Sequence, residues 1–212
     1  EAPIAQDAAM AEVRRYLASI QDADYRAAAE ELLRRHGEDF PLIPAAKSVH
    51  HGFRMGLLMH TGNMLKIADF LAGLYPEVID RSLLLAGTFA HDLAKAREFQ
   101  LSELGLATDY TVAGQLLGHL VMGAQEAAEV TKALGIPEEK GMLLQHLILS
   151  HHGEPEFGAA VKPACAEAEL LSYIDGIDSR MEICREALAE TETGRFSERI
   201  FALDGRRMYR HE

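Results

Sequence analysis

A histidine and an aspartate stand side by side at His91 and Asp92, and Lys95 follows one helical turn later. A carboxylate has two oxygens and can bridge two cations, while imidazole offers a nitrogen that suits divalent transition metals. Lys95 falls near His91 on one helical face, where its ammonium could stabilise charge on a phosphate. A single His-Asp pair occurs by chance in many proteins, so on its own it could equally be the capped end of a helix.

Other apolar segments also carry a histidine or an aspartate. A lone histidine in such a segment is more often a hydrogen-bonded core residue than a metal ligand. Because buried polar groups need partners, one shared metal centre explains them together more simply than a separate partner for each. The predicted ligands are His60, His91, Asp92, His119, His151 and Asp175.

The predicted chemistry is hydrolysis by an activated water held between two metal ions, which requires no protein nucleophile. We assign one ion to His60, His91, Asp92 and Asp175, and the other to Asp92, His119 and His151. Asp92 and Lys95 are then the expected catalytic residues. His152 and Asp178 are candidates for orienting a ligand or binding substrate, although Asp178 could instead pair with Arg180 or Arg185 at the surface.

The spacing of apolar residues is helical almost throughout, which predicts an all-α fold. The first two helices form an N-terminal hairpin, and a loop is expected over residues 105–111. The expected helices run over roughly 10–20, 24–37, 53–71, 76–92, 112–134, 137–153 and 164–188.

One compact body with three parts is the expected domain organisation. Residues 1–50 form the N-terminal hairpin and loop, residues 51–190 form the core, and residues 191–212 form a tail docked on that core. The hairpin could cover the domain's own core or form a subunit interface, so an oligomer is compatible with the sequence.

Composition narrows the function classes. The net charge of −12 argues against a broad electrostatic grip on nucleic acid, so a phosphate-bearing substrate must be held locally, for example by bound cations. Two cysteines, Cys165 and Cys184, are too few for a disulfide framework. The sequence shows no signal peptide and no stretch apolar enough to span a bilayer, and we expect a cytoplasmic protein.

The order of these residues, a histidine, a His-Asp pair, further histidines and a distal aspartate, resembles the HD-domain phosphohydrolases. Three stretches look like the HD portion of the YhaM-type 3′–5′ exoribonucleases: AAKSVHHG at 45–52, LQHLILSHHG at 144–153 and FSERIFALD at 196–204. The resemblance runs from about Met10 to the C-terminus and implies an HD-domain helical bundle.

This resemblance implies stepwise removal of nucleotides from the 3′ end of single-stranded RNA, with DNA as an alternative substrate. One or two divalent metal ions are expected, with Mn²⁺ favoured and Fe, Ni, Co, Zn or Mg as alternatives. In this family context Arg54 and Lys47 are candidate phosphate contacts. His50 and His51 could face the substrate or simply cap the helix that carries His60.

Two alternatives stay open. The relatives carry an OB-fold domain before the HD domain, and no counterpart precedes the first helix predicted here, so a shorter substrate such as a nucleotide or cyclic nucleotide is one alternative. The lack of a Gly-Tyr-Pro element after the His-Asp pair argues against the specialised cyclic-dinucleotide branch. The other alternative is a non-catalytic signalling module that keeps its metal for structure.

Overall fold

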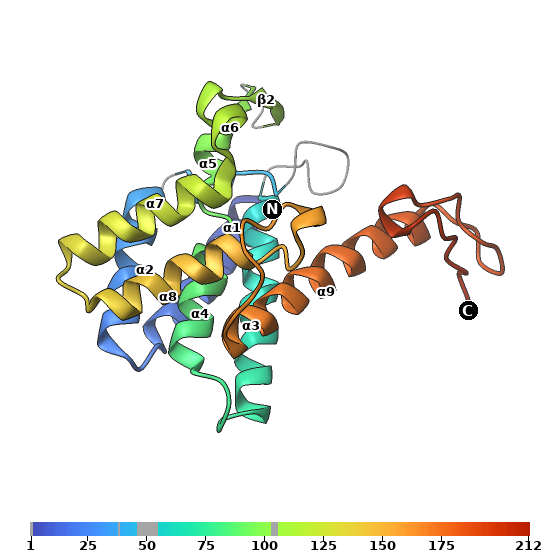
Figure 1. The fold of residues 1–212 in the computed structure, drawn as a ribbon. Helices are drawn as coiled ribbons and strands as arrows, with labels where there is room; N and C mark the ends of the chain where they lie inside the picture. Colours follow the sequence, from blue (N-terminus) through green and yellow to red (C-terminus); the bar gives the residue numbers. More distant parts are fainter. Residues whose placement is uncertain (1, 38, 46–54, 103–105) are drawn as a thin grey trace. The chain divides into compact units, whose positions relative to one another are not determined.

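The computed structural model describes residues 2–37, 39–45, 55–102 and 106–212, and they are mostly helical (Figure 1). This confirms the predicted all-α class, with one small antiparallel sheet in addition. In chain order the elements are α1 (Ala2–Ala18), α2 (Ala23–His36), η1 (Phe40–Leu42), α3 (Gly56–Leu74), α4 (Arg81–Ala90), α5 (Lys95–Glu98), β1 (Phe99–Leu101), β2 (Ala107–Tyr110), α6 (Val112–Leu116), α7 (Gly118–Ala133), α8 (Glu138–Ser150), η2 (Pro155–Phe157), α9 (Ala166–Ala189) and η3 (Phe201–Leu203).

The chain divides into two compact units, Glu1–Asp175 and Gly176–Glu212. The first unit contains every helix from α1 to α8 and the beginning of α9. The second contains the rest of α9 and a C-terminal segment that folds back on itself through the bridges Phe196–Tyr209 and Ile200–Arg206. The three-part division predicted from the sequence, including a docked tail, stays a prediction.

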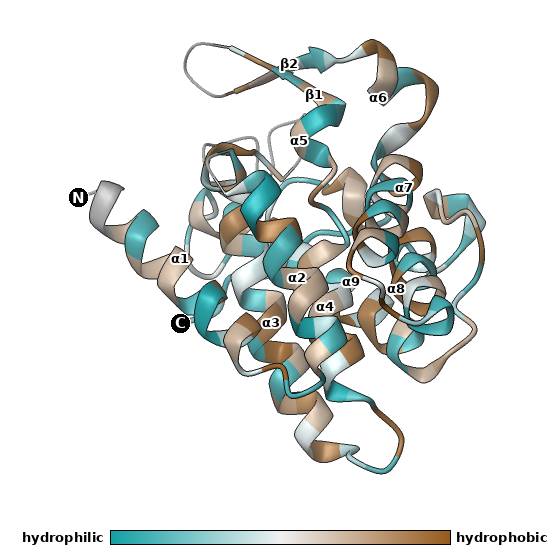
Figure 2. Ribbon diagram, turned by 90° about the vertical axis from the view of Figure 1, so that its left-hand side faces the viewer, coloured by the Kyte–Doolittle hydropathy of each residue, from teal (hydrophilic) through white to brown (hydrophobic). Residues whose placement is uncertain are grey.

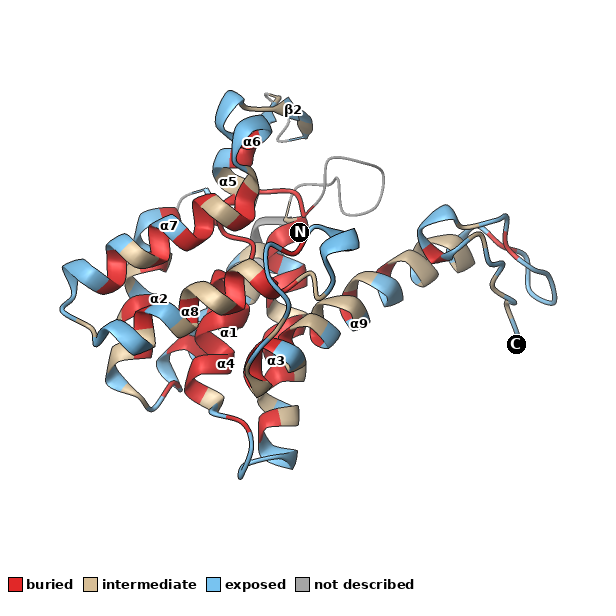
Figure 3. Cartoon of the chain, in the orientation of Figure 1, coloured by how far each residue is buried: buried red, intermediate tan, exposed pale blue. Residues whose placement is uncertain are grey.

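The core of the first unit forms around α4, which Figure 3 shows in red along nearly its whole length. This helix packs against α2, α3 and α8, so it has no free face. The rings of Phe40 and Phe89 meet edge to face, with centroids 5.7 Å apart. The outer helices are amphipathic instead, and hydrophilic and hydrophobic residues alternate along them in Figure 2.

The start of α4 differs from the prediction. We expected Pro76 in its first turn, but the helix begins at Arg81. Asp80 is the N-cap, and its side chain accepts hydrogen bonds from the backbone N–H groups of Ser82 and Leu83. A carboxylate cap satisfies donors that would otherwise lack partners, which makes Asp80 the stronger start signal.

The region between α5 and α7 also differs from the prediction. The expected loop at 105–111 contains β2, which pairs with β1. The single helix expected over 112–134 is two helices, because Gly118 at the start of α7 adopts the left-handed conformation with φ of 72°. Such a conformation strains most side chains, so a glycine at this position allows the chain to turn directly before His119.

A glycine also sets the contact between α4 and α8. A Cβ atom on Gly87 would lie 2.2 Å from Cδ2 and 3.1 Å from Cβ of Leu147, which is fully buried. We expect Gly87→Ala to lower the free energy of unfolding by about 1–3 kcal/mol through overpacking, despite the better helix propensity of alanine.

The matched control is Gly62→Ala in α3, where a Cβ would meet nothing within 4 Å. This variant should be neutral or more stable by up to about 1 kcal/mol. Urea unfolding followed by circular dichroism measures both, and equal stability of the two variants would disprove the close packing of α4 on α8.

Within the described part of the chain, no helix combines the length and the apolar character that crossing a bilayer requires.

Candidate metal centre

Five helices deliver the predicted ligands to one place in the first unit. His60 lies in the middle of α3, His119 lies in the first turn of α7, and Asp175 lies in α9. His91 and His151 are the C-cap residues of α4 and α8, and Asp92 directly follows His91. All are buried except Asp175, which is partly exposed.

Asp92 lies at the middle of this group. Its Oδ1 atom is 3.2 Å from Nε2 of His119 and 3.5 Å from Nε2 of His151. Its Oδ2 atom is 3.3 Å from Nε2 of His91 and 4.0 Å from Nε2 of His60, which in turn lies 3.2 Å from Oδ1 of Asp175. Each carboxylate oxygen therefore faces one of the two ligand sets that we assigned from the sequence.

Among the described residues, three sets of donor atoms could each hold an ion, since the atoms within a set lie no more than 4.8 Å from one another. The sets are His60, His91 and Asp175; His91, Asp92 and His151; and His119, His151 and His152. All six predicted ligands thus occur in at least one set.

The donor atoms fit a metal ion because several of them are buried and have no hydrogen-bond partner among the described residues. Among the described residues, Nε2 of His91, His119 and His151 and Oδ1 of Asp92 have no hydrogen-bond partner. Their mutual approaches of 3.2–3.5 Å are not hydrogen bonds in geometry. An unsatisfied buried polar atom is costly, and four in one place fit a bound cation.

The opposite nitrogen of each ring fixes the tautomer. Nδ1 of His91 donates to the carbonyl of Thr88 at 2.6 Å, and Nδ1 of His151 donates to the carbonyl of Ile148 at 2.7 Å. A carbonyl can only accept, so Nδ1 carries the hydrogen. In the neutral ring, Nε2 then presents its lone pair to the centre, as a metal ligand must.

Glu98 orients the ring of the third histidine, His119, and no pattern in the sequence pointed to Glu98. Its Oε1 atom lies 3.0 Å from Nδ1 of His119 and accepts the backbone N–H of His119 at 3.1 Å. Glu98 stands six residues after Asp92, and it meets His119 only because the chain returns through β1, β2 and α6. No spacing rule along the sequence could have connected the two.

The carboxylates at the centre stay ionised. Burial alone would raise the pKa of Asp92, but the Lys95 ammonium and the surrounding imidazoles outweigh it and hold that pKa well below its usual value. Burial also opposes ionisation of Asp175, yet its hydrogen bond with His60 lowers its pKa. Burial lowers the pKa of His119, but Asp92 and Glu98 raise it overall, so metal binding would displace a proton there.

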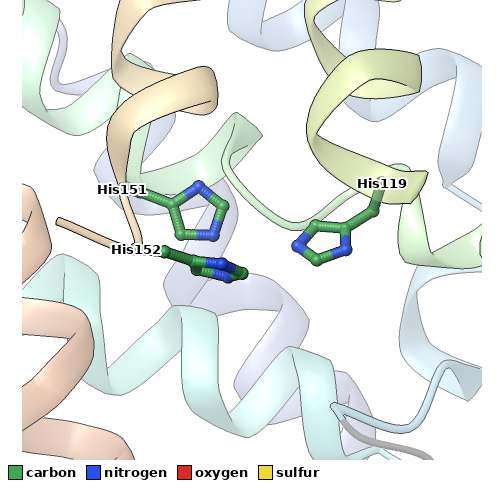
Figure 4. A group of neighbouring side chains, drawn as sticks. All are labelled: His119, His151 and His152. Carbon is green, nitrogen blue, oxygen red and sulfur yellow. The ribbon is translucent and has the colours of Figure 1, made fainter. Parts of the chain in front are cut away.

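His152, which we expected to bind substrate, lies among the candidate ligands. Figure 4 shows its ring beside that of His151, with both opposite His119. The ring centroids of His151 and His152 are 4.4 Å apart. Burial lowers the pKa of His152 to about 4, and its buried Nδ1 atom has no hydrogen-bond partner among the described residues.

The remaining predicted site residues fall into three groups. Lys95 is within the centre, where Nζ donates to Oδ2 of Asp92 and to the carbonyl of Ala45, both at 2.8 Å. Asp178 is buried in the second unit, one turn after Asp175 along α9. The other predicted contacts, Lys47, His50, His51 and Arg54, lie outside the described residues.

Comparison with known proteins identifies the class of protein that has this arrangement of ligands. The HD domain family matches residues 57–180, more than half of the chain, and the chain belongs to this family. Three curated relatives are called 3′–5′ exoribonuclease YhaM. Those of Bacillus licheniformis, Shouchella clausii and Bacillus subtilis are 40%, 41% and 38% identical to it, each over 209 residues and 99% of this chain.

These relatives confirm the resemblance that the motifs indicated. The chain spans 65%, 64% and 65% of their lengths in the same order, which is less than two thirds of each. No solved structure matches the chain significantly.

Proposed function

We propose that this chain carries the hydrolytic centre of a 3′–5′ exoribonuclease that shortens single-stranded RNA. The observation that carries the proposal is the buried carboxylate of Asp92, whose two oxygens face different sets of histidine nitrogens. This arrangement suits two cations that share one bridging ligand. The names of the relatives supply the substrate class and the direction of cleavage.

Two divalent cations are the proposed cofactors. His60, His91, Asp92 and Asp175 would hold one, and Asp92, His119 and His151 would hold the other. When bound, they lower the pKa of a water and polarise the scissile phosphodiester. Imidazole and carboxylate donors together suit Mn²⁺ as well as Fe, Co, Ni or Zn, and Mn²⁺ is our first choice.

The chain's own residues prepare this chemistry by fixing charge and orientation. Lys95 balances the charge of Asp92 and keeps that carboxylate in place. Glu98 and the carbonyls of Thr88 and Ile148 hold three histidine rings with Nε2 directed inward. Little reorganisation is then needed during the reaction, which favours catalysis.

Substrate contacts are the finer part of the proposal. His152 has a ring nitrogen without a hydrogen-bond partner among the described residues, so it is available to a phosphate oxygen or to a cation. We keep His50, His51, Arg54 and Asp178 as further candidates for substrate binding on the basis of the sequence.

The expected result with a 5′-labelled single-stranded RNA is a ladder of products that shorten one nucleotide at a time from the 3′ end in Mn²⁺. Chelation by EDTA should stop the reaction, and excess Mn²⁺ should restore it, because the donor set is unable to position a water without a cation. Gel electrophoresis with time resolves the ladder.

Internal cleavage fragments would contradict exonucleolytic action. If the RNA stayed intact while calorimetry still detected bound Mn²⁺, the RNA substrate would be wrong, and nucleotides and cyclic nucleotides would be tested next. A 3′-phosphorylated version of the same RNA serves as a control for the requirement of a free 3′ end.

A further inference from the structure

The second unit contains a basic, aromatic hairpin, residues 194–210, which we call the arm. Backbone hydrogen bonds close it, from Gly194 N to Arg210 O at 2.7 Å and from Ser197 N to Met208 O at 2.8 Å. Its tip turns at Asp204 and Gly205, whose φ angles are 59° and 70°. The arm is therefore a defined structure within its own unit.

Aromatic rings on the arm are exposed to an extent that its fold does not require. Phe201, the first residue of η3, is 97% exposed, and Phe196 and Tyr209 are 56% and 49% exposed. The rings of Phe196 and Tyr209 lie against each other with centroids 5.1 Å apart. Exposed aromatic faces of this kind are the platforms on which bases of single-stranded nucleic acids stack.

The charge of the arm is opposite to that of the whole chain. The arm contains five arginines against two carboxylates, Glu198 and Asp204, a balance of plus three in a chain with a net charge of −12. Such a local reversal is notable because the chain as a whole repels polyanions. A phosphate backbone is the partner that this concentration of guanidinium groups fits.

Three of these arginines are oriented by the arm itself. Arg199, Arg206 and Arg207 donate to the carbonyls of Gly205, Leu203 and Ser197 at 3.2, 3.0 and 2.8 Å. A guanidinium has five N–H donors, so most of them stay available for phosphate oxygens. Arg210 differs, because it donates to the carbonyls of Leu188 and Thr191 and so ties the arm to the end of α9.

Aromatic and basic groups come together around an open hollow of about 720 Å³. Arg199, Arg206 and Arg207 line it together with Phe196, and the guanidinium carbon of Arg207 lies 5.9 Å from the centroid of that ring. Asp204 is the one carboxylate in the lining and lies 3.8 Å from Arg206. The positive charge still exceeds the negative charge there.

We propose that the arm binds single-stranded RNA, with Phe201 as a stacking platform and Arg199, Arg206 and Arg207 as phosphate contacts. The choice of RNA rests on the proposed function, whereas the recognition chemistry applies to any single strand. Pairing of the arm with the arm of a second copy is a poorer alternative, since two arms of equal positive charge repel each other.

Fluorescence anisotropy of a labelled RNA 12-mer in EDTA tests this binding without hydrolysis. We expect Phe201→Ala to raise Kd about 5- to 150-fold, the range for loss of one stacked base. Arg199→Ala with Arg207→Ala should lower the slope of log K against log salt by about 1.4, at about 0.7 for each phosphate contact on a single strand.

Matched controls remove similar groups from the first unit. Phe70→Ala removes a ring that is 66% exposed in α3, and Arg15→Ala with Arg34→Ala removes two exposed guanidinium groups. Both controls should leave Kd and the salt slope near the wild-type values. Circular dichroism verifies that all variants keep their helical content.

Several outcomes would overturn the inference: no RNA binding by the wild type in EDTA, or arm variants that bind like the wild type. A variant that changes only the sedimentation of the protein would identify the arm as a subunit interface instead. Hydrolysis of the 5′-labelled RNA in Mn²⁺ is scored separately. A normal ladder with no arm effect refutes the arm alone, and an arm effect without hydrolysis refutes the proposed function alone.

Discussion

Replacing Asp92 with asparagine is expected to lower kcat by about a thousandfold or more. The physical reason is that asparagine has one carbonyl oxygen and no charge, so it is unable to bridge two cations as a carboxylate does. Loss of several kcal/mol of stabilisation at the reacting phosphate corresponds to this change in rate. Rates of RNA shortening at saturating Mn²⁺ measure it.

The same substitution should reduce the number of Mn²⁺ ions that each chain binds. Calorimetry measures this number. Wild-type protein at an Mn²⁺ concentration of a hundred times Kd gains about 2.7 kcal/mol of stability for each bound ion, and the variant should lose much of this gain. Both measurements are independent of RNA, so they test the metal centre even if the substrate is wrong.

Folding needs its own control, because Asp92 is buried and forms an ion pair with Lys95. Asparagine has nearly the same shape and can still accept from Lys95, so we expect the variant to keep its helical content. Asp7→Asn on the exposed surface of α1 removes an equal charge and should leave kcat and metal binding unchanged. Full activity of Asp92→Asn would disprove the proposed centre.

The sequence predicted those parts of the fold and site that depend on local patterns. Apolar spacing is a local property, so it identified the long helices that carry His60, His119 and Asp175. The adjacent pair His91 and Asp92 was recognisable because it, too, is a local feature of the sequence. Their convergence could be inferred only because separate partners for so many buried groups would be costly.

Features that depend on tertiary contacts were missed. The break at Gly118 interrupts an otherwise helical pattern, and β1 and β2 are too short to show alternation. The sequence named His152 as a candidate for orienting a ligand or binding substrate, and only the structure shows that its ring lies with the candidate ligands His119 and His151. The direction in which a side chain points at the end of a helix depends on the tertiary packing around it. Helix propensity does not determine that direction.

Glu98 is the residue for which the structure adds most, and we expect Glu98→Ala to weaken Mn²⁺ binding about 10- to 100-fold. This is the usual cost of losing a group that orients a ligating histidine. Without Glu98, Nδ1 of His119 has no acceptor to hold it, and the ring and its tautomer are no longer fixed. Calorimetry with Mn²⁺ measures the affinity directly.

Glu98→Gln distinguishes orientation from charge. A glutamine oxygen can still accept from Nδ1–H of His119, so orientation should be partly restored and the loss of affinity should be smaller than in Glu98→Ala. Because Glu98 acts only through His119, its loss should lower kcat little once Mn²⁺ saturates the centre. A purely structural role would instead lower the Tm without changing the affinity.

Glu126→Gln is the matched control, because Glu126 lies on α7, as His119 does, and forms another buried pair with a histidine. Its carboxylate oxygens lie 3.0 and 2.9 Å from Nε2 of His36, but neither residue is a candidate ligand. This control should lower the Tm and leave Mn²⁺ affinity intact. Equal loss of affinity in both variants would mean that α7 as a whole had shifted, and the specific role of Glu98 would be wrong.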